Sequence, residues 1–168
     1  KGLLPADYEK SWPEVWKHAT VWDLGKAAKD WPQITFIIYH SALRPFIELP
    51  EASLKQFEDT GRIDWVTDLA EIPQKFGVKN VHAELGTCFA NTCVTHPRLA
   101  AAMVGTLIKG LGQDKVVWGT DSVWYGSPQW QIEAMRRLEI PEDMQKKHGF
   151  KPLGAADGPV KSAIFAGN

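Results

Sequence analysis

Short apolar runs alternate with helix-like segments along this chain, and the alternation predicts its secondary structure. Ile34–His40 (ITFIIYH) and Lys115–Thr120 (KVVWGT) are short and rich in β-branched and aromatic residues, and Val78–Gly86 (VKNVHAELG) lies between them. Such runs are typical of strands buried on both faces, as in parallel sheets. We therefore predict three strands, near residues 33–40, 78–86 and 115–120.

Helix-like segments separate the predicted strands, and Pro and Gly residues mark many of their ends. In chain order they cover Asp23–Trp31, Glu51–Thr60, Trp65–Phe76, Pro97–Leu111, Pro128–Leu138 and Pro141–Lys147, with the opening of one more at Gly158–Ala166. Strands that alternate with helices predict βαβ units and a parallel sheet with right-handed crossovers. A full eight-stranded barrel takes about 250 residues. The chain is therefore either a small open α/β sheet or part of a barrel.

Composition and charge exclude several classes of protein. The chain has 168 residues, of which 44% are hydrophobic, enough for one domain with a core. Its 19 Lys and Arg nearly balance its 20 Asp and Glu, which argues against a nucleic-acid or anionic-membrane partner. No apolar stretch approaches the roughly 20 residues of a membrane span. We expect a cytoplasmic location, with the periplasm as the alternative because the chain opens with Lys1 rather than Met.

Cysteine and tryptophan add little to the choice of function. Cys88 and Cys93 fit no zinc-binding pattern, and a disulfide between them is possible but not implied. The eight Trp residues fill either a core and its rims or a surface on which sugars or aromatic substrates stack. Because they are scattered over different predicted elements, we favour the core.

Two polar residues stand at the carboxyl ends of predicted strands. His40 ends the run ITFIIYH, and Asp121 directly follows KVVWGT. In parallel α/β folds these strand ends face the active site, so the two side chains can share a pocket. Imidazole and carboxylate bind zinc and similar divalent ions, and both carry protons in catalysis. The structural alternatives are a hydrogen-bonded loop histidine and an aspartate that caps a helix or forms a turn.

Glu84 and Arg44 are candidate substrate-binding residues. In VHAELG the alternation puts His82 and Glu84 on one face of the strand, so Glu84 lies near the catalytic rim if that face lines a barrel. A guanidinium such as that of Arg44, four residues after His40, can bind a substrate carboxylate through two N–H groups. The structural alternatives are a polar layer in the sheet for Glu84 and a surface ion pair for Arg44.

Most motifs of known enzyme classes are missing. The chain has no H-x-H, no H-E-x-x-H, no phosphate-binding loop and no G-x-S-x-G. His40 and Asp121 supply two ligands, whereas a catalytic zinc site takes three from the protein. The chain by itself therefore predicts about half of a metal site.

Four segments of the chain together resemble the amidohydrolase superfamily, in particular its amidohydrolase-related branch. That branch includes aminocarboxymuconate-semialdehyde decarboxylase-like enzymes and several lactonases. ITFIIYHSAL is similar to the family's sixth barrel strand with its terminal His, NVHAELGT to the seventh, and VVWGTDS to the eighth with its metal-binding Asp. The closing SAIFAGN is similar to the start of the terminal helix, and the opening KGLLP to the segment after the fifth strand.

The resemblance implies a fold and a function. The fold is α/β, the C-terminal half of a TIM-type (β/α)8 barrel, incomplete as given, with residues 1–168 as a single domain. The function is that of a metal-dependent hydrolase or non-oxidative decarboxylase with a divalent metal, for which we expect zinc, and a small carboxylated or cyclic substrate. Asp121 carries over as metal ligand and proton acceptor, and His40 as a ligand or as a proton donor or acceptor. The remaining ligands would belong to an N-terminal half of the barrel upstream of Lys1.

Two other kinds of protein stay open. The chain is alternatively a catalytically inactive fragment or subdomain that covers exposed sheet edges by self-association, because bare edge strands pair readily. We expect a homo-oligomer. A Trp-lined carbohydrate-binding module is a third hypothesis, which the scattered Trp positions do not favour.

Overall fold

The computed structural model describes residues 7–44 and 50–168, and its described strands form one parallel sheet. The sheet order is β1–β2–β3, with β1 at Phe36–Ile38, β2 at Val81–Glu84 and β3 at Val116–Val117. Ile37 lies opposite His82 in the register of the first pair. All three strands fall inside the predicted ranges, and their parallel pairing is confirmed. The opening KGLLP segment lies outside the described residues.

Most predicted helices are confirmed, with ends shifted by at most a few residues. They are α3 (Leu24–Asp30), α4 (Pro50–Thr60), α5 (Val66–Phe76), α7 (Pro97–Leu111), α9 (Gln129–Arg137) and α10 (Glu142–His148). Short helices that the pattern did not predict are α1 (Tyr8–Ser11), α2 (Pro13–Ala19), α6 (Gly86–Ala90) and α8 (Ser122–Tyr125). The last predicted helix is α11 (Pro159–Ser162), which continues as a π-helical turn over Ala163–Gly167.

The prediction of half a TIM-type barrel is wrong. The structure is 61% helical, and its small three-stranded sheet is not closed. The strands are only two to four residues long, because the chain turns soon after each of them: into a 3₁₀ turn at Tyr39–Ala42 after β1 and into α6 after β2. Strands this short have few backbone groups to pair, so they cannot form the tilted, staggered wall of a barrel. A mixed α/β architecture is compatible with the structure.

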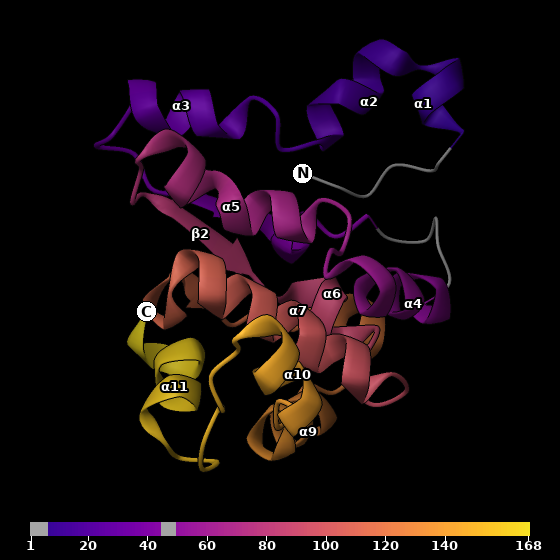
Figure 1. Ribbon diagram of the computed structural model, residues 1–168, viewed down its shortest axis with the longest axis vertical. Coiled ribbons are helices and arrows are strands. Elements are labelled where there is room, and N and C mark those ends of the chain that lie inside the picture. Colours follow the sequence, from indigo (N-terminus) through magenta and orange to yellow (C-terminus); the bar gives the residue numbers. More distant parts are fainter. Residues whose placement is uncertain (1–6, 45–49) are drawn as a thin grey trace.

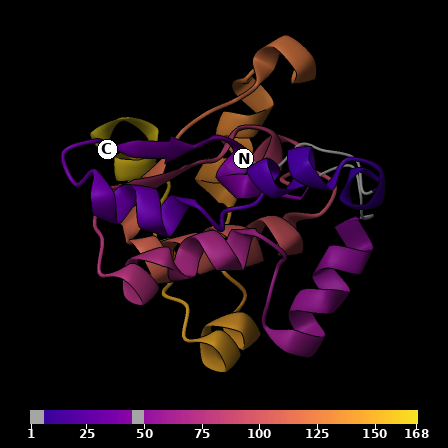
Figure 2. The same ribbon diagram turned by 90° about the horizontal axis from the view of Figure 1, so that it is seen from above.

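Helices α5 and α7 cover one face of the sheet (Figures 1 and 2). Because side chains alternate along a strand, Val81, Ala83 and Val116 point toward these helices and are fully buried. The two helices approach closely at Gly110, where an added Cβ would lie 2.2 Å from the carbonyl oxygen of Ala70. This packing builds the hydrophobic core between the sheet and the helices.

The opposite face of the sheet carries polar and exposed side chains. Ile37 in β1 points to this side and is 54% exposed, and His82 and Glu84 follow it on β2. In Figure 2 the helical layer lies below the sheet, and α8 stands out on the other side. The polar residues that the sequence placed on one face of β2 thus face away from the core.

The tryptophans divide between core and surface. Trp16 and Trp65 are buried and meet edge to face, with ring centroids 5.0 Å apart. The exposed ones are Trp12, Trp22, Trp31 and Trp124. Filling of a core and its rims, predicted for the set, is therefore confirmed for Trp16 and Trp65, whereas these four lie at the surface. Cys88 and Cys93 are buried free thiols. None of the described helices combines the length and hydrophobicity needed to cross a bilayer.

Candidate functional site

His40, Glu84 and Asp121 meet at the carboxyl ends of the three strands. Nδ1 of His40 lies 3.3 Å from Oδ2 of Asp121 and 3.5 Å from Oε2 of Glu84. The side chains of His40, Glu84 and Asp121 are 9%, 12% and 19% exposed, respectively. The structure therefore brings together three residues that the sequence singled out, in a largely buried cluster.

Thr87 joins these side chains through two hydrogen bonds. Its hydroxyl donates to Oδ2 of Asp121 at 2.5 Å, and its backbone N–H donates to Nδ1 of His40 at 3.1 Å. The backbone N–H of His40 in turn donates to Oε2 of Glu84 at 2.8 Å. Because Nδ1 of His40 accepts a hydrogen bond, the neutral imidazole carries its proton on Nε2. These bonds fix the orientation of the imidazole and of both carboxylates.

Strained backbone is concentrated at the cluster. His40, Ser41 and Ala42 have φ of 53°, 51° and 56°, and Asp121 has φ of 49°. Of the described non-glycine residues with positive φ, only Trp65 lies elsewhere. Such conformations cost on the order of 1–3 kcal/mol each and are typical of functional sites. The strain lets His40 turn back toward Glu84, and the Ser41 hydroxyl secures the turn by donating to the Glu84 carbonyl oxygen at 2.9 Å.

Two glycines make room for the side chains of the cluster. A Cβ added to Gly119 would lie 1.5 Å from Oε1 of Glu84, and one added to Gly86 would lie 2.5 Å from Nδ1 of His40. Gly86 also has φ of 28°, a conformation that other residues rarely adopt. The cluster therefore depends on the absence of a side chain at both positions.

A residue of α9 stabilises the turn that carries Asp121. The side chain of Gln131, which is fully buried, donates through Nε2 to the carbonyl oxygen of Thr120 at 2.8 Å. The hydroxyl of Ser122 donates to Oγ1 of Thr120 at 2.8 Å. Both bonds flank Asp121, so its position does not depend on the hydrogen bond from Thr87 alone.

Burial raises the pKa of the Glu84 carboxyl, and the nearby charge of Asp121 raises it further. The hydrogen bond from the His40 backbone acts in the opposite direction. Two carboxylates thus share one small, poorly solvated volume. A proton or a cation between them would relieve their repulsion.

The donor set of the cluster fits a divalent metal by type. Zinc binds both imidazole nitrogen and carboxylate oxygen, and a catalytic zinc takes three ligands from the protein. In the conformation described, the Thr87 N–H occupies the lone pair of His40 Nδ1. Across residues 7–44 and 50–168, no three His, Cys, Asp or Glu side chains are arranged to hold a metal ion between them. A metal therefore requires this hydrogen bond to break or the imidazole to turn.

Arg44 lies among aromatic rings and carboxylates. Its guanidinium sits over the rings of Trp16 and Trp65, 5.4 Å and 5.7 Å from their centroids, and pairs with Asp64 at 3.2 Å and Glu9 at 3.7 Å. This is the ion-pair alternative for Arg44, reinforced by cation–π contacts. Its role as a substrate clamp stays a prediction.

The sequence did not single out Thr87, Gly86 or Gly119. Thr87 directly follows the second strand as predicted, Val78–Gly86, so the rule that selected Asp121 could have found it. In the structure β2 ends at Glu84 and Thr87 lies in the first turn of α6. Nothing local in the sequence indicates that Gly119 faces Glu84, because that contact joins two strands.

No protein-family model, curated protein or solved structure matches this chain. The resemblance to the amidohydrolase superfamily therefore rests on the four segments quoted above and stays a prediction.

Proposed function

We propose that this chain carries part of the active site of a metal-dependent hydrolase or non-oxidative decarboxylase of the amidohydrolase type, acting on a small carboxylated or cyclic substrate. The observation that carries the proposal is the approach of both the Asp121 and Glu84 carboxylates to Nδ1 of His40. Strained backbone at His40 and Asp121 adds support, because proteins keep such strain mainly where a site requires it.

His40, Glu84 and Asp121 are the residues that would hold the metal, and zinc is the ion that their ligand types favour. When bound, such an ion would supply Lewis-acid polarisation of a substrate carbonyl or of a water. Asp121 accepts a proton at Oδ2, where the Thr87 hydroxyl already donates and orients the carboxylate. Glu84, with its raised pKa, holds a proton closer to neutral pH than an exposed carboxyl does. His40 stabilises charge that develops next to it, through the proton on Nε2.

Two measurements on the purified chain test the metal part of the proposal. Elemental analysis after dialysis against zinc should find close to one ion per chain, and Asp121→Asn should lower that occupancy severalfold. Asp59→Asn is the matched control, because Asp59 is an exposed aspartate that pairs with Lys55 on the same helix. If Asp121→Asn keeps the metal content of the unmodified chain, the assigned role of Asp121 is wrong.

A substrate panel tests the reaction. Release of CO2 from unsaturated carboxylic acids and ring opening of lactones are followed in parallel, with zinc supplied. We expect turnover of one of these two substrate classes. Asp121→Asn and His40→Asn should each reduce it by roughly 10²-fold or more, as for groups that transfer protons. Turnover that survives both substitutions would remove this cluster from the chemistry.

A second candidate is a non-catalytic subdomain that self-associates through its exposed sheet edge. The observation that favours it is the exposure of Ile37 in β1 and of Tyr39 directly after it, since β1 is an edge strand in the described sheet. Sedimentation equilibrium of the unmodified chain and of Ile37→Lys tests it. The candidate predicts a dimer or larger species that the lysine shifts to monomer, whereas a monomeric unmodified chain rejects it.

A further inference from the structure

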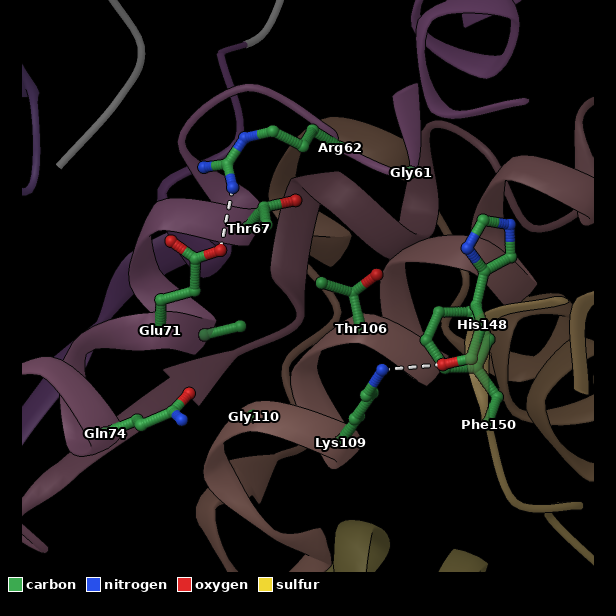
Figure 3. A pocket seen from close by; sticks show the side chains of 11 residues that line it. Gly61, Arg62, Thr67, Glu71, Gln74, Thr106, Lys109, Gly110, His148 and Phe150 are labelled. Atoms are coloured by element: carbon green, nitrogen blue, oxygen red, sulfur yellow. Dashed lines mark hydrogen bonds and ion pairs between the residues drawn. The ribbon is translucent and has the colours of Figure 1, made fainter. Parts of the chain in front are cut away.

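A pocket of about 480 Å³ lies between α5 and α7, bounded by the Gly61–Arg62 turn and by the residues that end α10 and follow it (Figure 3). Its size falls in the range of small-molecule sites, about 300–1,000 Å³. The described residues that line it include no member of the cluster around His40. The pocket is therefore a separate place in the molecule, which the proposed chemistry does not use.

The lining carries more positive than negative charge. Arg62 and Lys109 contribute two cations, and Glu71 contributes one carboxylate. That carboxylate is shared between Arg62 at 2.7 Å and Lys75 at 2.6 Å, and Arg62 also pairs with Asp68 at 2.7 Å, so these four charges balance and Lys109 supplies the excess positive charge. Lys109 donates to the carbonyl oxygen of His148 at 2.6 Å, which uses one of the three N–H groups of its ammonium. Further N–H donors on Lys109 and Arg62 remain for a ligand.

The imidazole of His148 lies close to positive charges. Burial lowers the pKa of its imidazole, and the charges of Lys147 and Lys109 lower it further. The ring packs against Phe57 and Phe150, with centroids 4.4 Å and 5.6 Å away. A neutral, packed imidazole adds no charge, so the net positive charge of the pocket comes from Lys109.

Thr106 supplies an independent sign of a ligand. It is 8% exposed, and its hydroxyl oxygen is buried without a hydrogen-bond partner among the described residues. In Figure 3 its side chain stands between the α5 residues and Lys109, with the hydroxyl turned toward the side on which His148 lies. Buried hydroxyls are nearly always satisfied, so one at a pocket wall calls for a partner that enters from the pocket.

Close contacts at two glycines of α7 fix the positions of the pocket walls. Gly110 allows α7 to touch the backbone of α5 at Ala70, and Gly105 allows Phe150 to pack where a Cβ would lie 2.6 Å from its ring. These two contacts lie on either side of Thr106 along α7. The walls are therefore set by backbone packing, and the space exists before a ligand enters.

We propose that this pocket binds a small anionic molecule whose carboxylate or phosphate oxygens accept hydrogen bonds from Lys109, Arg62 and the Thr106 hydroxyl. Both kinds of oxygen suit ammonium and guanidinium donors, and a hydroxyl donor adds to either. The volume limits the ligand to a small organic acid or phosphate ester.

Nuclear magnetic resonance titration of the full chain with inorganic phosphate and with succinate, at constant ionic strength, tests the proposal. Saturable shifts are expected at Thr106, Gly110 and His148 with at least one of the two anions, and the anion that saturates names the class. Lys109→Gln should weaken binding roughly tenfold, as the loss of one charged hydrogen bond does. Lys146→Gln, at an exposed lysine of α10 paired with Glu142, should leave the affinity unchanged.

Thr106→Val separates a ligand role from a structural one. Because the hydroxyl has no partner among the described residues, the valine should raise the melting temperature and at the same time lower the affinity for the anion severalfold. The proposal is overturned if neither anion saturates, if Lys146→Gln weakens binding as much as Lys109→Gln, or if Thr106→Val binds as tightly as the unmodified chain. The Thr106 test holds even if Lys109→Gln fails to fold.

Discussion

Replacing Gly119 by Ala tests how tightly the cluster is built. The new Cβ would lie 1.5 Å from Oε1 of Glu84 and 3.1 Å from its Cγ, so the Glu84 side chain has to leave its place. Overpacking costs about 1–3 kcal/mol, and a buried His40 N–H that loses its acceptor costs about 1–3 kcal/mol more. We therefore expect the free energy of unfolding to fall by about 2–6 kcal/mol.

Urea unfolding followed by tryptophan fluorescence and by circular dichroism measures this loss. Gly167→Ala is the matched control, since its Cβ would meet nothing closer than 3.6 Å, and it should change stability by less than about 0.5 kcal/mol.

The same substitution in a Glu84→Ala background isolates the contact. With the Glu84 carboxyl removed, the Gly119→Ala change should cost less than about 1 kcal/mol, so the two substitutions should be strongly non-additive. An equal cost in both backgrounds would show that Gly119 is needed for another reason. A cost below about 1 kcal/mol in the unmodified chain would show that Glu84 does not occupy the position described.

Three further predictions concern single groups. Because the folded-state pKa of Glu84 is raised, its contribution to stability is present below its unfolded pKa of about 4.3 and is lost as the pH rises through the folded value. In chelator-treated protein, Glu84→Gln should therefore gain stability over the unmodified chain between about pH 4 and 7. A difference in the free energy of unfolding that stays constant over this pH range would contradict this. Burial raises the pKa of Cys93 to about 11, and it also raises the pKa of Cys88. The native thiols should therefore react with Ellman's reagent at pH 8 roughly 10²-fold more slowly than free cysteine. Rapid reaction before urea is added would contradict the burial of these thiols. Thr106→Val should raise the free energy of unfolding by about 1 kcal/mol in phosphate-free buffer, measured by urea denaturation, and a loss of stability would indicate that the hydroxyl has a partner.

Local patterns in the sequence were sufficient for the elements. Pro97 and Gly112 bound α7 where the apolar periodicity begins and ends, and Gly77 closes α5 with φ of 68°. These signals work because capping and helix termination involve residues within one turn of each other. The very short helices α1, α6 and α8 escaped because four or five residues carry too little periodicity.

The candidate site was partly within reach of the sequence. His40 and Asp121 were selected because parallel strands bring their carboxyl ends to one edge, and Glu84 because side chains alternate along a strand; neither rule needs coordinates. The contacts of Arg44 with Trp16 and Trp65 were out of reach, because these partners are 28 and 21 residues away in the chain and no local pattern joins them.

By itself, then, the sequence determined the strands, the longer helices and the residues that end the strands, because these depend on neighbours along the chain. The tertiary structure decided that the sheet stays open with three short strands, which overturned the half-barrel. It also decided that Thr87 joins the cluster, that Gly119 must lack a side chain and that a pocket forms beside Thr106. Each of these depends on distances between segments far apart in the sequence, and only the packing of the whole chain sets those distances.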